Sequence, residues 1–277
     1  MFEKVSRSWE LVKASASVLR SDKELMLFPV ISGAVTAVLL ATFLVPAFML
    51  RAFAEGFQLG AVVFAFLFYF VQYSVVIYFN TALVGAAMIR MDGGDPTLAD
   101  GFRAANARLG PILGYAAISA TVGVVLQALK NNRDHFIVRL IGSGLGAAWT
   151  LATFLVVPVL VARRIGPIDA MKESVSLLRR TWGENAVGQV GIGAAFGLVI
   201  AGVVLAGVLF TVLAAQVSWT LAIAVGAVFV LGVLLLMVFQ SALSGIYSAA
   251  LYRYAVSHEA PEGFGNADLG HAFLPKP

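Results

Sequence analysis

Six long apolar runs, none containing a charged residue or a histidine, divide this chain. Each is long enough to cross a bilayer, because roughly 20 apolar residues span about 30 Å of hydrocarbon. The predicted spans cover residues 25–50, 59–89, 111–129, 140–162, 187–215 and 219–251. The pattern therefore predicts an all-α integral membrane protein with six transmembrane helices.

Each pair of spans follows a segment with helical periodicity, at residues 3–20, 97–109 and 167–182. The apolar stripes of the first and third are Val5, Trp9, Val12, Ala16 and Leu19, and Ile168, Met171, Val175, Leu178 and Trp182. An apolar stripe beside basic residues is typical of a helix lying among lipid headgroups. The predicted headgroup contacts are Lys13, Arg20, Lys172, Arg179 and Arg180. The alternative is a cytoplasmic helix packed under the bundle.

Two short strings occur twice in the same order at nearly one offset. K-A-S-A-S-V-L-R at 13–20 matches K-E-S-V-S-L-L-R at 172–179, and F-N-T-A-L-V-G from Phe79 matches F-Q-S-A-L-S-G from Phe239. They predict a duplicated unit of one amphipathic helix and two spans. Because each unit has an even number of spans, the repeats are parallel. Pro96 and Pro167, each predicted to begin a helix, indicate a diverged middle copy.

Composition and charge support this interpretation. Hydrophobic residues make up 60% of the 277 residues and charged residues 12%, against about 25% charged in soluble domains. Four of the 19 Lys and Arg residues fall on one side of the predicted spans and the other 15 on the opposite side. The positive-inside rule then predicts that both termini are cytoplasmic.

The second repeated string carries Asn80-Thr81 on span two and Gln240-Ser241 on span six. Asn80 lies about 15 Å along the helix from Arg90, and Gln240 about 20 Å from Arg253, so both pairs are expected near mid-bilayer. They either line a polar site for a small solute, ion or headgroup, or form interhelical hydrogen bonds that hold the bundle together. The second interpretation has the stronger precedent in membrane helices.

Little in the sequence suggests catalysis. Cysteine is absent, the three histidines have no metal-ligand spacing, and no predicted span contains a carboxylate. We therefore expect no enzymatic activity, cofactor, metal site or bound nucleic acid.

The string G-P-I-D-A-M-K-E-S-V-S-L-L-R-R-T-W-G-E-N at 166–185 and the segment Ser8–Val30 resemble uncharacterised bacterial and archaeal six-span membrane proteins of unknown function. A more distant resemblance is to the membrane domain of glycerophosphodiester phosphodiesterases. It implies no catalysis, because the chain lacks the soluble segment that would hold the active-site acids and histidine. The family resemblance implies no established activity either.

The resulting expectation is a single transmembrane domain at residues 1–254 and a mostly irregular tail at 255–277. The leading functional hypothesis is a non-enzymatic protein of a bacterial or archaeal plasma membrane. It would organise lipid or a protein partner, including a second copy of itself, at the cytoplasmic face. The alternative is a channel or facilitator lined by Asn80, Thr81, Gln240 and Ser241.

Overall fold

Helices make up the regular structure of this computed structural model, which describes residues 2–49, 59–130, 144–146, 148–182, 191–264 and 269. Six stretches of the described chain are long and apolar enough to cross a membrane. The elements are α1 (Phe2–Ser21), η1 (Lys23–Met26), α2 (Leu27–Met49), α3 (Leu59–Met91), α4 (Leu98–Asn106), α5 (Leu109–Lys130), α7 (Val156–Ala162), α8 (Pro167–Trp182), α9 (Gly191–Ala215) and α10 (Trp219–Ser257).

The turn between α3 and α4 contains hydrogen bonds that end the first helix and cap the beginning of the second. Gly93 has a φ of +79° and, with Gly94, returns hydrogen bonds to the carbonyls of Arg90 and Ile89, which ends α3. The Thr97 hydroxyl accepts from the N–H of Asp100, whose carboxylate accepts from the Thr97 N–H. The helix therefore begins after Thr97, and the prediction that Pro96 is its first residue is wrong. Pro167 does begin α8.

The fourth predicted span is not one continuous helix. Helical residues end at 152, a turn covers 153–155, and α7 begins at Val156. Pro158 has no N–H to donate to the carbonyl of Phe154, which weakens a helix through this point. The break exposes the N–H of Leu155, which donates to the Ser174 hydroxyl of α8 at 3.2 Å. The polar groups of a broken membrane helix need such partners.

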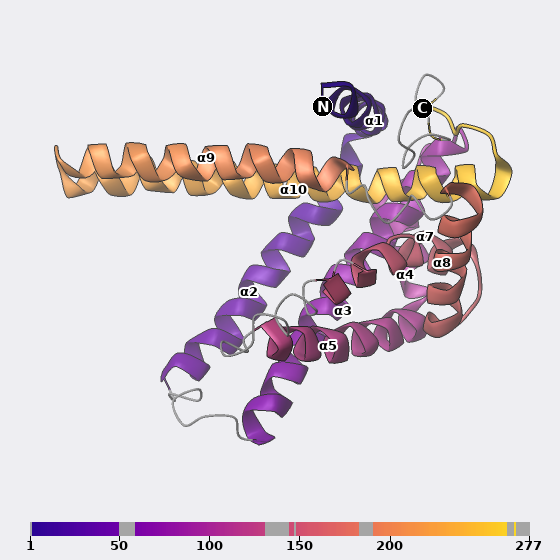
Figure 1. Cartoon of the computed structure of the whole chain (residues 1–277), viewed down its shortest axis with the longest axis horizontal. Helices are drawn as coiled ribbons and strands as arrows, with labels where there is room; N and C mark the ends of the chain where they lie inside the picture. Colours follow the sequence, from indigo (N-terminus) through magenta and orange to yellow (C-terminus); the bar gives the residue numbers. More distant parts are fainter. Residues whose placement is uncertain are drawn as a thin grey trace.

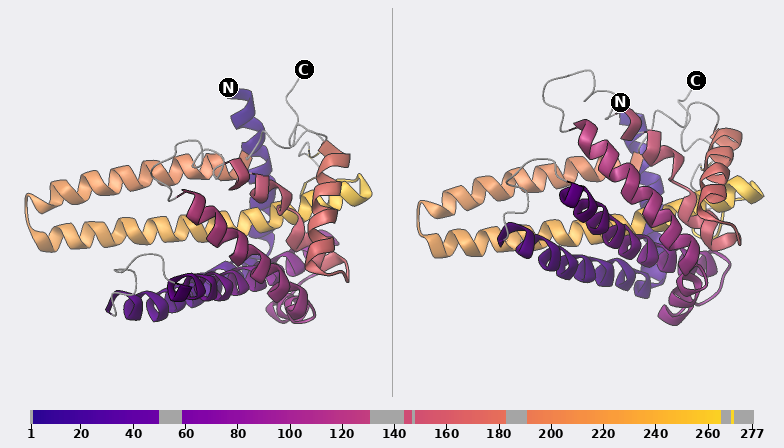
Figure 2. Two further views of the ribbon diagram at one scale, coloured as in Figure 1. Left: turned by 60° about the horizontal axis from the view of Figure 1, so that its bottom comes forward. Right: turned by 90° about the horizontal axis from the view of Figure 1, so that it is seen from below.

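The helices form hairpins that diverge from one shared end of the molecule (Figure 1). The α9–α10 hairpin forms a long arm, and α2 and α3 diverge from it in Figure 1 while running toward the same side of the molecule in the turned views (Figure 2). The beginning of α2 and the ends of α3, α7 and α10 lie at the shared end, together with α1 and α8. The hairpins therefore leave and return to the same side of the molecule.

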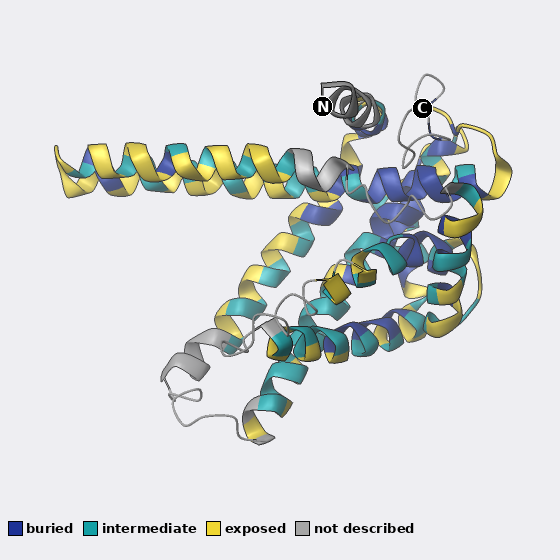
Figure 3. Cartoon of the chain, viewed as in Figure 1, coloured by how far each residue is buried: buried dark blue, intermediate teal, exposed yellow. Residues whose placement is uncertain are grey.

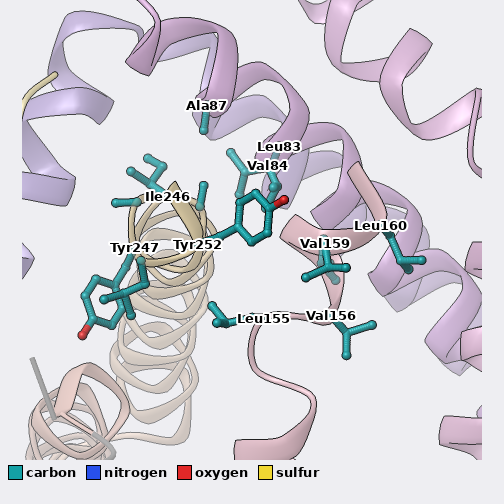
Figure 4. Close-up of a cluster of buried hydrophobic side chains, with 14 of the residues drawn as sticks. Leu83, Val84, Ala87, Leu155, Val156, Val159, Leu160, Ile246, Tyr247 and Tyr252 are labelled. Atoms are coloured by element: carbon teal, nitrogen blue, oxygen red, sulfur yellow. The ribbon is translucent and has the colours of Figure 1, made fainter. Parts of the chain in front are cut away.

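The buried core lies at this shared end (Figure 3). The last third of α10 runs through its centre and packs against α1, α2, α3, α7 and α8. Side chains from three segments converge there: Leu83 and Val84 of α3, Leu155 and Val159 around α7, and Ile246 and Tyr252 of α10 (Figure 4). The outer parts of α9 and α10 expose apolar side chains such as Leu198, Leu205 and Ile223. Lipid is the environment suited to these surfaces.

The short helices follow a common placement. α4 packs on α3 and α8 packs on α7, so each packs on the second helix of the hairpin before it. α1 packs on α10, the second helix of the last hairpin. This arrangement brings the first and last helices of the described chain into contact.

The chain after α10 is irregular but attached. His258 adopts a left-handed conformation that ends the helix. Phe264 and Leu269 are fully buried in the core cluster, although they follow the predicted domain boundary at residue 254. A Cβ on Gly263 would come within 2.7 Å of the Val18 side chain, so this segment lies directly against α1.

Candidate functional site

A polar pocket of about 220 Å³ lies between α2, α3 and α10. Its polar lining consists of one amide and four hydroxyls: Asn80 from α3, Ser32 from α2, and Ser241, Ser244 and Ser248 from α10. Its apolar walls come from Pro29, Val76, Phe79, Leu83, Phe154 and Gly245. The structure thus brings together one member of each predicted amide–hydroxyl pair.

Most of the polar groups in the pocket have no partner within the described chain. The Asn80 amide and the hydroxyls of Ser32, Ser241 and Ser244 make no hydrogen bond to a described residue. The Ser248 hydroxyl donates to the Gly245 carbonyl at 2.9 Å and retains lone pairs that can accept. Unpaired amide and hydroxyl groups at this depth are costly unless water, a ligand or lipid satisfies them.

The other two predicted site residues lie outside this pocket. Thr81 is fully buried, and its hydroxyl donates to the Ile77 carbonyl one turn back along α3. Gln240 is not among the lining residues. A different amide holds helices together: Gln72 donates from Nε2 to the Thr36 hydroxyl at 3.3 Å, joining α3 to α2.

The sequence contains a signal for the missed lining residues on α10. Ser241, Ser244 and Ser248 are spaced i, i+3 and i+7, which places them on one face of a helix. Three hydroxyls on one face of a transmembrane helix indicate a polar seam. Ser32 has no comparable signal, because the packing of α2 against α3 and α10 brings it to the pocket.

The second group of predicted site residues lies on α1 and α8. Both helices bury a face against the protein, which for α8 contains Ala170, Ser174 and Leu177. Of the predicted stripe of α8, Leu178 is buried and Met171 packs against the core, whereas Ile168 is 57% exposed. Lys172 and Arg179 are exposed and lie four residues after Ile168 and Val175, so they border the stripe.

The remaining basic residues of this group are also exposed. Lys13 and Arg20 of α1 and Arg179 and Arg180 of α8 form no ion pair with another described residue. Lys172 pairs with Asp169 at 3.6 Å, a solvent-exposed contact of small energetic value. Four full positive charges are therefore available at the shared end of the molecule.

Other charged groups at this end support the fold. Arg108 donates from Nε to the Leu160 carbonyl at 2.9 Å, which satisfies the end of α7. Arg253 of α10 forms an ion pair with Asp92 and donates to the Met88 carbonyl near the end of α3. Arg90 donates to the hydroxyl of Ser21 at 3.3 Å. These arginines connect the ends of different helices, and Arg253 joins the α9–α10 hairpin to the end of α3.

Asp22 is a buried acid beside this network. Its Oδ1 accepts from the N–H of Glu24, and its Oδ2 has no partner in the described chain. Burial raises the pKa of the Asp22 carboxyl above 3.8, while the Glu24 N–H and the Arg90 charge act in the opposite direction. Among the described residues no group of His, Asp and Glu could hold a metal ion.

The six long apolar helical stretches of the described chain are those of a multi-pass α-helical membrane protein. Within that class, the chain belongs to a family of unknown function (DUF6159), which it matches over residues 59–263. No curated protein and no solved structure matches the chain.

Proposed function

We propose that this protein organises anionic lipid at the cytoplasmic face of a bacterial or archaeal plasma membrane and catalyses no reaction. In this orientation both termini and the shared end of the hairpins face the cytoplasm, as the distribution of Lys and Arg predicts. The observation that carries the proposal is α8, where exposed Ile168 lies one turn before exposed Lys172, and Arg179 and Arg180 are exposed in the last turn. An exposed apolar side chain beside basic ones matches the boundary between acyl chains and phosphates.

The expected electrostatic contribution is measurable. A Lys or Arg near an anionic membrane surface contributes about 1 kcal/mol. Neutralising three of them should therefore lower the preference for anionic over neutral lipid by on the order of a hundredfold at low ionic strength. Salt should reduce the preference of the native protein, since exposed charges are screened beyond about 10 Å at 0.1 M.

The test uses the full chain in lipid nanodiscs and spin-labelled lipids that compete for its surface. The triple variant Lys172→Gln, Arg179→Gln, Arg180→Gln is compared with Lys130→Gln, Arg133→Gln, Arg139→Gln, which removes the same charge from the loop predicted on the other side. We expect only the first to lose the preference for anionic lipid. An equal loss in both variants, or no preference in the native protein, would contradict lipid organisation and leave a protein partner as the reason for the basic surface.

A second candidate function is a facilitator for a small solute. Its support is the unpaired Asn80 amide in the same pocket as Ser241. Proteoliposomes containing the native chain would then equilibrate an uncharged polar solute faster than protein-free vesicles, and Asn80→Leu would slow this exchange. Equal rates with and without protein would exclude the facilitator.

A further inference from the structure

We infer that the pocket between α2, α3 and α10 is a binding site for a small uncharged polyol group. The polyol is either a free solute or the headgroup of a lipid. This inference names the ligand class of the pocket on which the second candidate function rests, and it requires binding but no transport.

The lining excludes a charged ligand. None of the residues around the pocket is Asp, Glu, Lys, Arg or His, and an ion moved from water into such a site loses its hydration without gaining a counter-charge. The available groups are hydroxyls and one amide, each of which can both donate and accept. Their best complement is a ligand that also does both at several neighbouring positions.

The walls select further among such ligands. Phe79, Phe154 and Leu83 add apolar surface to a lining that also contains the seryl hydroxyls of α10. A polyol matches both sides, because its hydroxyls can meet the polar seam while its C–H groups pack against the rings. The volume of about 220 Å³ holds about seven waters at roughly 30 Å³ each. A polyol with about as many non-hydrogen atoms, such as glycerol or erythritol, has a suitable size.

The pocket opens sideways between membrane-spanning helices. Two of its lining residues, Val76 of α3 and Ser241 of α10, are exposed and lie within candidate spans. Ser248 lies about 8 Å and Ser241 about 18 Å along α10 from Arg253, so the hydroxyls extend from the headgroup region into the bilayer. A lipid headgroup can therefore reach the pocket from the side, and a free polyol can reach it from the headgroup region.

The experiment measures saturable binding of labelled glycerol and erythritol by equilibrium dialysis against the full chain in phosphatidylcholine nanodiscs. Methylammonium and acetate serve as small charged controls. Asn80→Leu keeps the side-chain shape without the amide, and Ser241→Ala removes one exposed hydroxyl with little risk to folding. Each should weaken polyol binding about three- to tenfold, the effect of losing one neutral hydrogen bond.

Ser74→Ala is the matched control, because Ser74 lies on α3 outside the pocket and its hydroxyl donates to the Phe70 carbonyl. It should leave polyol binding unchanged. Absence of saturable polyol binding, or full-strength binding in both Asn80→Leu and Ser241→Ala, would overturn the inference. Stronger binding of methylammonium or acetate than of either polyol would also overturn it.

Two lipids of equal charge distinguish the sources of the polyol. Phosphatidylglycerol carries a glycerol headgroup and phosphatidylserine does not. If a lipid headgroup is the natural ligand, phosphatidylglycerol in the nanodisc should compete with free polyol and weaken its binding. Phosphatidylserine in the nanodisc should not. Equal binding of free polyol in the two kinds of nanodisc supports a free polyol as the natural ligand. Saturable binding without faster flux in proteoliposomes would retain the site and exclude the facilitator, so the two proposals fail separately.

Discussion

Adding one methyl group at Gly85 tests how closely α4 packs on α3. A Cβ at this position would lie 2.6 Å from the Cβ of Ala104, whereas carbon atoms pack best at about 3.5–4.0 Å. The Ala104 methyl is fixed to its backbone and cannot rotate away. Gly85→Ala must therefore move α4 away from α3 by about 1 Å. A second close contact resists this movement, because Gly101 of α4 packs so tightly that a Cβ there would meet Phe28 and the Ala82 carbonyl.

Two opposing effects set the magnitude. Overpacking of this kind costs about 1–3 kcal/mol, while alanine is favoured over glycine in a helix by up to about 1 kcal/mol. The matched control is Gly202→Ala in α9, where a Cβ would meet nothing within 4 Å. Gly202→Ala therefore gains helix propensity without the cost of overpacking. The two variants should therefore differ by about 1–3 kcal/mol in the free energy of unfolding.

The assay is thermal unfolding of both variants in one detergent, followed by intrinsic fluorescence. At about 2–4 °C per kcal/mol for a domain of this size, Gly85→Ala should unfold roughly 2–12 °C below Gly202→Ala. Adding Ala104→Gly to Gly85→Ala moves the methyl group across the contact and should recover most of the loss. Equal midpoints for the two single variants, or no recovery in the double variant, would refute this account of the contact.

Two further predictions concern buried polar side chains. Ser15 and Ser174 occupy matching positions of the repeated string, but only Ser174 accepts a hydrogen bond, from the Leu155 N–H, while Ser15 has no described partner. Ser174→Ala should lower the free energy of unfolding by about 1–3 kcal/mol, whereas Ser15→Ala should leave it nearly unchanged. Equal shifts in the unfolding midpoint of the two variants would contradict this. The pKa of Asp22 is raised in the folded protein, so the folded state holds this proton more tightly than the unfolded chain does. The protein should therefore lose stability as pH rises from 3.8 through the folded pKa. Asp22→Asn should flatten that part of the stability profile, measured as unfolding midpoint against pH, and an unchanged slope would argue against it.

The sequence predicts the fold class because length and apolarity alone decide whether a helix can span a bilayer. All six predicted spans correspond to candidate spans in the structure. The break in the fourth was not predicted, although Pro158 is a local signal for it. The partner of the freed Leu155 N–H has no local signal, since Ser174 lies 19 residues away. Likewise, Pro96 fits the first position of a helix by residue type, but Thr97 and Asp100 form the cap.

The candidate site was predicted in part for a similar reason. Asn80 and Ser241 are identifiable as polar residues in apolar helices, and the structure places both in one pocket. Thr81 differs because a threonine in a helix can satisfy its hydroxyl with the carbonyl four residues back, as it does here. Ser32 depends on how α2 crosses α10, and a crossing between distant helices has no local signature in sequence.

The contact between α1 and α10 has a consequence for the order in which the protein can form during synthesis. α1 emerges early, yet the helix that covers it is completed about 240 residues later. At about 5–20 residues per second, this is a wait of roughly 10–50 s. Throughout that interval α1, whose Val12, Val18 and Leu19 are buried in the complete protein, lacks the helix it packs against. Ribosome-bound chains stopped before α10 should therefore leave α1 open to protease or to chaperones, and protection should arrive in one step with the last hairpin.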